Sequence, residues 1–471
     1  MVRQWHRCIP PPLLMPWLGG LRMFAEKLKR GGEERITVAS ACSGTDLYVH
    51  CLDSLKRFWS SELAVDIEFD YVLAAEKCEA KQQFLRTQYR PAFLLRDIED
   101  LTKTKATNLV TNLLEFIPHA KWFFAGFSCT SRSKMNVHSS ANRGCIQDGQ
   151  GATGDSFHKV RQFIEKCRPE FILLENVVEL SEVSEDSGVS DEEYILSVLA
   201  SAGFAARCFR VSCADYGSCV ERDRLYFVGL DLTPSAEEAE VLFTAAAKLM
   251  DCMKVGPGNF DDCVMSAEQM IHFIQDIPPE PKAKKAREAD CKWHEKDRDI
   301  FHDLSVKWPP VMDPAMLELF EGWGLRVAEI AHVAHQYFPL EVDDKWFFLD
   351  ANHTLERLLR WNPAAPRHVH NPWRRTCSTL TGHSKIVPRR RRSKTKELIL
   401  RPLFSIEGMR MIGWDLAFWR WPVFGDLVTQ DVLVSLAGNA FSGYALTPLV
   451  IAVIGRLGRV ALGASSCQDD P

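Results

Sequence analysis

Between about residue 33 and residue 230, strand-like runs alternate with polar or amphipathic stretches. Five of these runs are rich in β-branched, aromatic and aliphatic residues: 35–42, 69–76, 92–97, 121–127 and 171–176. Such alternation is typical of βαβ units, in which the strands lie parallel and helices cover both faces of the sheet. The last run is apolar at successive positions, as expected of a central parallel strand. We therefore predict an α/β fold with a doubly wound, mostly parallel sheet.

After about residue 234 the pattern changes, which indicates a second unit. Residues 236–394 contain many Pro and Trp residues and a highly charged stretch at 279–299, and helical patterns resume near Phe404. The sequence thus predicts five segments: a poorly ordered leader (1–32), the main α/β domain (33–235), a smaller domain or insertion (236–394), a return to the main domain (395–460) and a tail (461–471).

Net charge, hydropathy and cysteine spacing exclude several classes of protein. A net charge of −5 over 471 residues argues against a protein that coats nucleic acid indiscriminately. The apolar stretch 445–455 is shorter than the roughly 18 residues that a spanning helix requires and contains Pro448, so no membrane segment is predicted. Fifteen cysteines without a C-x-x-C pair favour reduced thiols in an intracellular protein, and no metal site is predicted.

One basic run, 388–397, carries six Lys and Arg side chains. It is interpreted either as a solvated loop, as a contact to phosphates, or as a nuclear import signal, and the sequence leaves these alternatives open. If the cell is eukaryotic, the run makes the nucleus the expected location.

Polar residues follow the predicted strands at the edge where open α/β sheets bind ligands. They are Cys42, Ser43, Gly44, Glu76, Asp97, Cys129, Glu175 and Asn176. Each alone is as readily a turn, a helix cap or a core residue, but together they predict a binding site. Glu76 suits the two hydroxyls of a ribose and Asp97 suits an adenine amino group, so the expected ligand is an adenosyl compound. No GxGxxG fingerprint is present, which disfavours a dinucleotide and a hydride-transferring oxidoreductase.

Six motifs resemble those of the cytosine-C5 DNA methyltransferases, in the family's order and spacing, over most of residues 35–460. The family's F-S-G-x-G, G-F-P-C-Q-x-F-S and E-N-V motifs resemble CSGTD (42–46), GFSCTSRS (126–133) and ENV (175–177). Its A-x-x-Y-G-V-P-Q-x-R-x-R, R-E-x-x-R-L-Q-G-F and terminal G-N-A motifs resemble ADYGSCVERDR (214–224), IEGMRMIGW (406–414) and LAGNAFSGYALTPL (436–449).

The resemblance implies a Rossmann-like methyltransferase that uses S-adenosylmethionine, with a target-recognition domain within 236–394. Cytosine C5 is a poor nucleophile, and a thiolate that adds at C6 makes it electron-rich enough to take a methyl group. Because C5 and C6 are unreachable inside a duplex, the base must be flipped out of the DNA partner. Cys129 is then the nucleophile, Glu175 holds the N3 and amino edge, and Arg222 and Arg224 hold the O2 side.

The remaining predicted site residues fall into two groups. Those expected at the cofactor are Cys42, Ser43, Gly44, Thr45, Glu76, Asp97, Ile98 and Asn439. Those expected at the nucleic acid are Ser133, Asn176, Arg389, Arg390, Arg391 and Arg392.

The chain also departs from the family motifs. Ser128 replaces the Pro before the nucleophile, which removes a fixed φ angle, and Thr130 replaces the Gln after it. Val220 and Ile406 replace a Gln and an Arg in the later motifs. Two alternatives therefore accompany the DNA enzyme: an RNA cytosine-C5 methyltransferase, and a descendant that binds DNA or S-adenosylmethionine without transferring methyl.

Overall fold

The computed structural model describes residues 17–24, 26, 35–42, 44–64, 66–134, 136, 138–231, 235–265, 325–338, 344–351, 375–381, 384–391, 398–414 and 430–460. Ser43, Arg392, the charged stretch 279–299 and the predicted tail 461–471 lie outside the described residues.

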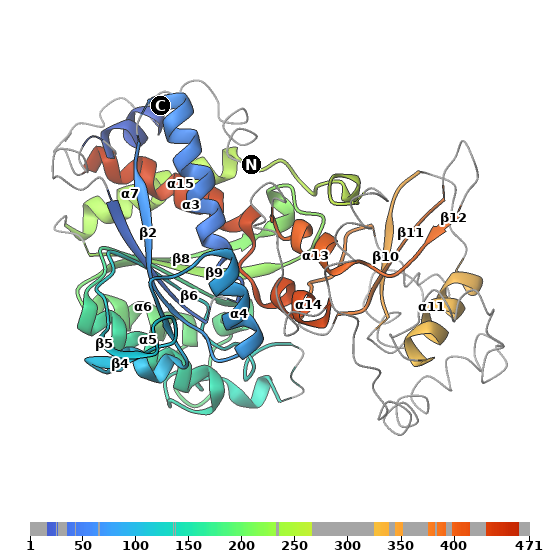
Figure 1. Cartoon of the computed structure of the whole chain (residues 1–471), viewed down its shortest axis with the longest axis horizontal. Helices are drawn as coiled ribbons and strands as arrows, with labels where there is room; N and C mark the ends of the chain where they lie inside the picture. The colour runs from blue at the N-terminus through green and yellow to red at the C-terminus, as the bar shows by residue number, and fades with distance from the viewer. Residues whose placement is uncertain are drawn as a thin grey trace.

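A seven-stranded sheet forms the centre of the main body (Figure 1). Its strand order is β3-β2-β1-β6-β7-β9-β8. The bounds are β1 Arg35–Ala41, β2 Glu68–Ala75, β3 Phe93–Leu95, β6 Trp122–Ala125, β7 Phe171–Val177, β8 Ala205–Ser212 and β9 Asp223–Leu230. The first five strands in this order are parallel, whereas β9 runs antiparallel to β7 and β8. The predicted mostly parallel α/β sheet is confirmed, and its strand order reverses direction between β1 and β6, where such sheets bind ligands.

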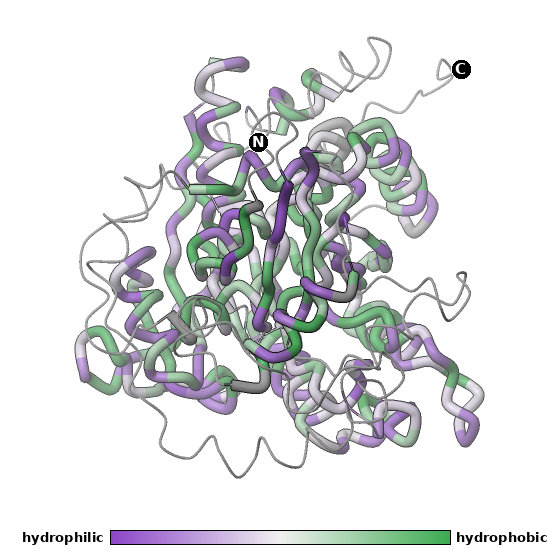
Figure 2. The backbone as a smooth tube through the Cα atoms, turned by 90° about the vertical axis from the view of Figure 1, so that its right-hand side faces the viewer, coloured by the Kyte–Doolittle hydropathy of each residue, from purple (hydrophilic) through white to green (hydrophobic). Residues whose placement is uncertain are grey.

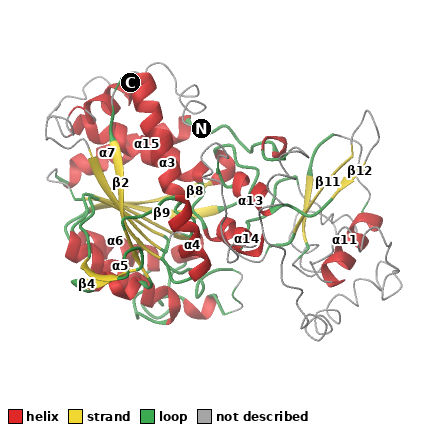
Figure 3. Cartoon of the chain, in the orientation of Figure 1, coloured by secondary structure: helices red, strands yellow, loops and turns green. Residues whose placement is uncertain are grey.

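Helices cover both faces of this sheet (Figures 1 and 3). The helices on one face are α3 (Leu47–Phe58), α7 (Ala236–Cys252) and α15 (Gly443–Val460), and those on the other are α5 (Gly151–Cys167) and α6 (Asp191–Ser201). The helix α4 (Glu79–Gln88) adds Phe84 and Leu85 to the first cluster. Figure 2 shows hydrophobic segments running through the centre of the molecule. The sheet is therefore buried on both sides, which leaves the strand ends as the place for polar side chains.

Two helices begin at capping boxes that the sequence specifies. In α6 the Ser190 hydroxyl accepts from the Glu193 amide at 3.1 Å, and the Glu193 carboxylate accepts from the Ser190 amide at 2.9 Å. Ser235 and Glu238 form the same arrangement at α7. Because each box satisfies amides that have no partner within the helix, it fixes the residue at which the helix begins.

A smaller three-stranded antiparallel sheet lies apart from the main sheet, with α11 beside it (Figure 1). Its elements are β10 (Phe347–Asp350), β11 (Ile386–Arg391), β12 (Leu398–Leu400) and α11 (Leu325–Tyr337). The helices α13 (Ser405–Met411) and α14 (Gln430–Asn439) lie between the two sheets. α7 falls within the predicted second unit, yet it packs against α15 and β8, so the main body extends past residue 235.

A hairpin of β4 (Lys105–Asn108) and β5 (Leu113–Phe116) follows β3, and the sequence analysis did not anticipate it. It sits at the β3 side of the sheet, where Leu109 N donates to Leu94 O at 2.8 Å.

Part of the predicted leader is folded. Residues 17–24 are helical, and Trp17 and Leu21 are fully buried in the main core. Trp17 Nε1 donates to Ile451 O of α15 at 3.1 Å. The expectation of a poorly ordered leader is thus wrong for this segment, because two apolar side chains four residues apart share one face of a helical turn and pack on α15.

One stretch among the described residues, Val432–Gly455, is long and apolar enough to cross a membrane. However, 89% of its most apolar window is buried inside the protein, as in the core helix of a globular domain.

Candidate active site

The loop after β6 carries Cys129 and is folded tightly on itself. The amides of Arg132 and Ser133 both donate to Cys129 O, at 3.0 and 2.9 Å. The first turns of α5 also hold the loop, because Ser128 N donates to Ser156 Oγ at 3.0 Å and Ser131 N donates to Thr153 Oγ1 at 3.1 Å. Cys129 is therefore presented on a turn next to the start of a helix, where the dipole favours a negative charge.

Asn176 connects the end of β7 to this loop. Its amide Nδ2 donates to Phe127 O at 2.9 Å, and its Oδ1 accepts from Val177 N at 2.8 Å. The side chain is only 1% exposed. Asn176 was predicted to contact the nucleic acid, but its amide is instead committed to the protein backbone, where it positions the nucleophile loop.

Glu175 forms ion pairs with two arginines of β9 and the loop before it. Glu175 Oε1 lies 3.1 Å from Arg224 Nε and 3.4 Å from Arg222 Nη2. Arg222 is buried, and its Nη1 donates to Gly438 O at 2.7 Å. The antiparallel pairing of β7 with β9 places these side chains together, since Val177 faces Arg224 across the pair.

The charges of this group act on the Cys129 thiol. Burial raises the pKa of Cys129 above its ordinary value, and the negative charge of Glu175 raises it further. Arg224, and more weakly Arg222, oppose this rise. The structure thus brings together all four residues predicted to be catalytic, and Arg224 is the strongest local influence that favours the thiolate.

Cys129 lines a cavity of about 800 Å³. The nucleophile loop contributes Ser133, Lys134 and Asn136, and the segment after β7 contributes Glu179. The opposite wall comes from Asp350 and residues 378–381 of the smaller unit, and the cavity also includes Arg210, Glu221, Asp223, Arg224, Gly438 and Asn439. A space of this size accommodates a small organic ring with several polar contacts.

Hydrogen bonds between residues 376–379 and 219–221, here called the backbone zipper, join the two walls of the cavity. Cys377 N donates to Cys219 O at 2.9 Å, and Glu221 N donates to Cys377 O at 2.8 Å. The Thr379 hydroxyl donates to Glu221 O at 2.5 Å, and the Thr376 hydroxyl donates to the Glu221 carboxylate. Residues 376–379 are thereby fixed beside Arg222.

The predicted cofactor residues gather at the carboxyl ends of β1, β2 and β3. Gly44 has a φ of +70°, and a Cβ there would lie 2.5 Å from Asn439 O, so only glycine fits. This contact brings the first and last family motifs together. The Asn439 side chain bonds to Ser435 of its own helix at 2.8 Å while the residue lines the cavity.

Two acidic residues, Glu76 and Asp97, lie just after the carboxyl ends of β2 and β3. Glu76 is nearly buried, and its Oε1 accepts from Cys78 N at 2.8 Å. Asp97 accepts from Glu99 N at 3.1 Å through Oδ1 and lies 3.5 Å from Lys77 Nζ. The Thr45 hydroxyl is buried without a hydrogen-bond partner. A buried hydroxyl without a partner in the turn after β1, together with carboxylates at the ends of β2 and β3, fits a polar ligand at this end of the sheet.

Cys42 and Ile98 complete this end of the site. Burial, and then the charges of Glu76 and Asp97, raise the pKa of Cys42 to about 12, so its thiol stays neutral at physiological pH. Ile98 is nearly buried at the start of a 3₁₀ turn, Ile98–Thr102, that Asp97 caps. Ser43 lies outside the described residues.

The arginines predicted to contact phosphates differ from one another. Arg389 is fully buried, donates to Phe338 O at 2.7 Å, and has no surface with which to reach a phosphate. Arg390 forms an ion pair with Asp261 at 2.6 Å, whereas Arg391 is exposed. Strand alternation places Arg390 on the other face of β11 from Arg389 and Arg391. Arg391 differs from Arg389 because it is the last residue of the strand, and the sequence analysis did not consider either effect.

Two further motif residues serve the framework. Glu407 is buried in an ion pair with Arg401 at 2.7 Å and accepts from Met265 N at 3.1 Å. Arg410 donates to the carbonyl oxygens of residues 262–264. Both side chains fix the segment that leads out of the main body.

The cavity wall formed by residues 378–381 was missed by sequence reasoning. The prediction looked for polar residues at the ends of the strands of the main sheet. It could not find this wall, because residues 378–381 belong to a distant segment. Arg132 was also missed, although one charged residue in a loop of small hydroxyl residues is a visible signal.

The sequence profile of the C-5 cytosine-specific DNA methylases matches residues 61–418, which is more than half of the chain. The chain belongs to this family. The enzymes of this family depend on S-adenosylmethionine, and the family resemblance expected from the sequence is confirmed.

Among curated proteins, the methylase is similar to DNA (cytosine-5-)-methyltransferase DMT5 of Cryptococcus neoformans var. grubii. The two are 25% identical over 154 residues, which is 33% of this chain and 6% of that protein. This methylase therefore aligns with only a small part of its relative's length.

Two solved structures are also similar to the methylase. The Dnmt2 methyltransferase of S. pombe is 14% identical with a TM-score of 0.41, and the Entamoeba histolytica methyltransferase EhMeth is 11% identical with a TM-score of 0.44. Each comparison covers 91% of this chain and 99% of the other.

Proposed function

We propose that this methylase transfers a methyl group from S-adenosylmethionine to C5 of cytosine in DNA, with Cys129 bonded to C6 of a flipped base during the reaction. The observation that carries the proposal is the position of Cys129, which lines the cavity beside the Glu175–Arg224 ion pair. Cys129 and Arg224 line this cavity, and Glu175 is paired with Arg224 behind its wall. A nucleophile, a guanidinium and a carboxyl group are the groups that cytosine activation requires.

The bond changes centre on the Cys129 sulfur. As a thiolate, Sγ would donate an electron pair to C6, and the C5–C6 π pair would move to C5. C5 would then take the methyl group of S-adenosylmethionine, whose S–CH3 bond breaks with its electron pair left on sulfur, so that S-adenosylhomocysteine leaves. Loss of the C5 proton to water or a nearby base then restores the double bond and expels Cys129 as a thiolate. Arg224 supports both the formation and the release of the thiolate, because its positive charge lowers the pKa of Cys129.

Glu175 would hold the N3 and amino edge of the ring and favour its protonated form, which is more electrophilic at C6. Arg222 and Arg224 fix the orientation of Glu175 through its Oε1. Asn176 and the start of α5 hold the nucleophile loop at the same cleft. Such support reduces the reorganisation that the reaction would otherwise need.

The residues at the ends of β1, β2 and β3 fit an adenosyl cofactor. Glu76 would accept hydrogen bonds from the ribose hydroxyls, Asp97 from the adenine amino group, and the partnerless Thr45 hydroxyl would gain a partner. S-adenosylmethionine supplies an electrophilic methyl group on a positively charged sulfur when it is bound.

Two observations favour DNA as the substrate: the match to the C-5 cytosine-specific DNA methylases, and the similarity to the DNA (cytosine-5-)-methyltransferase DMT5. Arg391 is exposed on the smaller unit and is available for a phosphate contact. In a eukaryotic cell such a substrate would require import into the nucleus, which stays a prediction from the basic run 388–397.

A methyl-transfer assay tests the proposal. The protein is incubated with methyl-labelled S-adenosylmethionine and either duplex DNA or transfer RNA. Cys129→Ser should abolish label in DNA, because a hydroxyl does not form the nucleophilic anion at neutral pH. Cys167→Ser is the matched control, since Cys167 is a half-buried thiol on α5 that does not line the cavity.

The outcomes separate the candidate functions. Label in DNA that disappears in Cys129→Ser and persists in Cys167→Ser supports the proposal. Label in RNA alone would assign the RNA activity instead, and cofactor binding without label would assign a binding protein. Equal transfer by Cys129→Ser would exclude Cys129 from the chemistry.

A further inference from the structure

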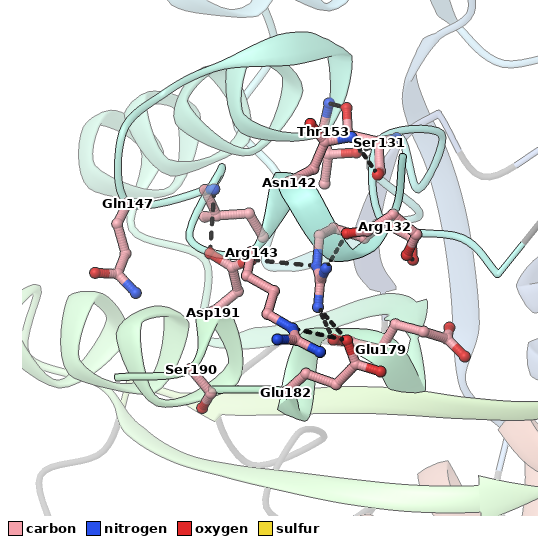
Figure 4. Close-up of polar contacts among 12 residues, drawn as sticks. Ser131, Arg132, Asn142, Arg143, Gln147, Thr153, Glu179, Glu182, Ser190 and Asp191 are labelled. Carbon is pink, nitrogen blue, oxygen red and sulfur yellow. Dashed lines mark hydrogen bonds and ion pairs between the residues drawn. The ribbon is translucent and has the colours of Figure 1, made fainter. Parts of the chain in front are cut away.

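Arg132 is a fully buried arginine that lies three residues after Cys129. Its guanidinium contacts four groups from segments far apart in the chain (Figure 4). The Nη1 group donates to Ser139 O, and Nη2 donates to Glu179 O and lies 3.2 Å from the Glu182 carboxylate. The Nε group faces Asp191 at 3.6 Å.

The main chain of Arg132 is fixed as well. Its amide donates to Cys129 O at 3.0 Å, and its carbonyl oxygen accepts from the Ser139 hydroxyl at 2.6 Å. The residue is therefore held at both its backbone and its side chain, and any shift of Arg132 is transmitted through one peptide turn to Cys129.

Asp191 is the buried counter-charge of Arg132. Both side chains have no exposed surface, and Asp191 Oδ1 also accepts from Ile146 N at 3.1 Å. Asp191 is the first residue of α6, whose capping box fixes the helix start. A buried ion pair seldom adds net stability but is costly to break, so its value lies in the single geometry that it specifies.

The partner carbonyl of Glu179 lies in the 3₁₀ turn Val178–Ser181, directly after the strand that carries Glu175. Arg132 thus connects the loop with the sulfur to the segment that follows the carboxyl group. Glu179 itself lines the cavity, so this connection runs along one wall of the site.

We propose that Arg132 is a positioning residue, which clamps the Cys129 loop against the 178–181 turn and the start of α6. The clamp supplies the rigidity that a proline before Cys129 would give, since Ser128 leaves the φ angle at that position free to vary. The effect on methyl transfer rests on the proposed function, whereas the effect on the loop does not.

The test combines two variants with hydrogen exchange. Arg132→Met alone would leave Asp191 buried without its cation, which is expected to unfold the chain. It is therefore paired with Asp191→Asn, which keeps the acceptor for Ile146 N. Arg132→Lys keeps the positive charge but loses the planar guanidinium group and its several hydrogen-bond donors. Exchange of the amides of residues 128–134 is followed by mass spectrometry, together with kcat and KM for methyl transfer to duplex DNA.

Arg143→Gln is the matched control. Arg143 also bonds to the Glu182 carboxylate, at 3.3 Å, and to Glu185, at 3.2 Å, but it makes no contact with the nucleophile loop in Figure 4. Arg143→Gln therefore removes the other cation that pairs with Glu182 and keeps the contacts of Arg132 with the loop.

In Arg132→Met/Asp191→Asn, the loop amides should exchange at least about 10-fold faster while those of β7 keep their protection. Because a displaced nucleophile costs rate more than binding, kcat should fall about 10- to 100-fold with KM within about 3-fold of wild type. Arg132→Lys should lie between, and Arg143→Gln should match wild type in both measurements.

Two results would overturn the proposal: unchanged loop protection in the folded double variant, or faster exchange that is spread over the whole protein instead of the loop. Faster loop exchange in a protein whose wild type transfers no methyl group would uphold the clamp and reject the proposed function.

Discussion

A Cβ atom on Gly44 would lie 2.5 Å from the carbonyl oxygen of Asn439, so the turn after β1 and the end of α14 meet backbone to backbone. Residues separated by almost 400 positions in the sequence thus form one surface at the ends of the parallel strands. The C-terminal return of the chain is therefore part of the site and not only of the core.

Gly44→Ala should lower the affinity for S-adenosylmethionine at least about 10-fold, because the new Cβ collides with main chain and the φ of +70° is strained for alanine. Calorimetric titration measures the affinity, and a thermal melt shows whether the variant is folded. Gly229→Ala is the control, since a Cβ there meets Ile172 side-chain atoms at 3.5 Å, an ordinary contact. Equal affinities in the two variants would contradict this close-approach argument.

Opposite substitutions around Cys129 should move its thiol pKa in opposite directions. Arg224 lowers this pKa and Glu175 raises it, so Arg224→Gln should shift the pH midpoint of Cys129 alkylation upward and Glu175→Gln should shift it downward. Alkylation by iodoacetamide, followed at the Cys129 peptide by mass spectrometry, reads the thiolate without requiring turnover. Shifts in the same direction would show that the two side chains act by another route.

Asp46 should make the protein less stable as pH rises from about 4 to about 7. Burial raises its pKa from 3.8 to about 7, against hydrogen bonds from Tyr71 and Ser40 that lower it. Between these values the folded state binds more protons than the unfolded state, so the free energy of unfolding falls with increasing pH, by at most about 1.4 kcal/mol per pH unit from this group. Below the lower value the group contributes no change.

Denaturant unfolding of Asp46→Asn at several pH values tests this linkage, and the slope over that window should become shallower. Tyr71→Phe removes a hydrogen bond that favours the charged carboxylate, so it should extend the falling window to higher pH. An unaltered slope in Asp46→Asn would assign the pH dependence to other groups, of which Glu76 also has a pKa raised by burial.

Two neighbouring arginines should respond differently to salt. Arg391→Gln should weaken DNA binding and reduce the log–log salt slope by about 0.9, as expected for one lost phosphate contact. Arg389→Gln should leave that slope unchanged and lower stability instead, because Arg389 is fully buried and donates to Phe338 O. Fluorescence anisotropy at several salt concentrations supplies the slopes, and a reduced slope for Arg389→Gln would contradict its buried placement.

Trp17→Ala should destabilise the main body by about 3–5 kcal/mol, the usual cost of removing a fully buried large aromatic side chain. Chemical denaturation gives the free energy, and Val241→Ala, at a position 63% exposed on α7, is the control. A loss below about 1 kcal/mol would indicate that the segment 17–24 packs only weakly on α15.

The sequence predicted the site residues best where a single strand of the main sheet determines the position of a side chain. Glu76, Asp97 and Cys129 follow parallel strands, and Glu175 lies two residues before the end of β7. Such positions can be found in the sequence because the apolar run of the strand stops there. The βα alternation therefore predicted both the sheet and the edge at which these residues meet. The position of β9 between β7 and β8, antiparallel to both, could not be predicted. Hydrophobic periodicity identifies a strand but not the strands with which it pairs.

Side-chain direction and long-range packing limited the remaining predictions. Arg389 and Arg391 belong to the same basic run and share one face of β11, yet Arg389 is buried within the strand and Arg391 is exposed at its end. The position of the strand end, which the basic run does not reveal, distinguishes them. Trp17 lies in a proline-rich stretch that resembles a leader, and its burial depends on α15, more than 400 residues away. Arg132 gains buried partners from the 178–181 turn and from the start of α6, two distant segments that no local pattern encodes.

The zipper between residues 376–379 and 219–221 has a consequence for protein engineering. In a chimera that carries the smaller unit of another member of the family, the obvious junctions are the ends of the three-stranded sheet β10–β12. Such a graft would discard the strip that is hydrogen-bonded beside Arg222. A working chimera must therefore keep residues 376–379 with the host chain, so that only the part of the smaller unit beyond this strip can be exchanged.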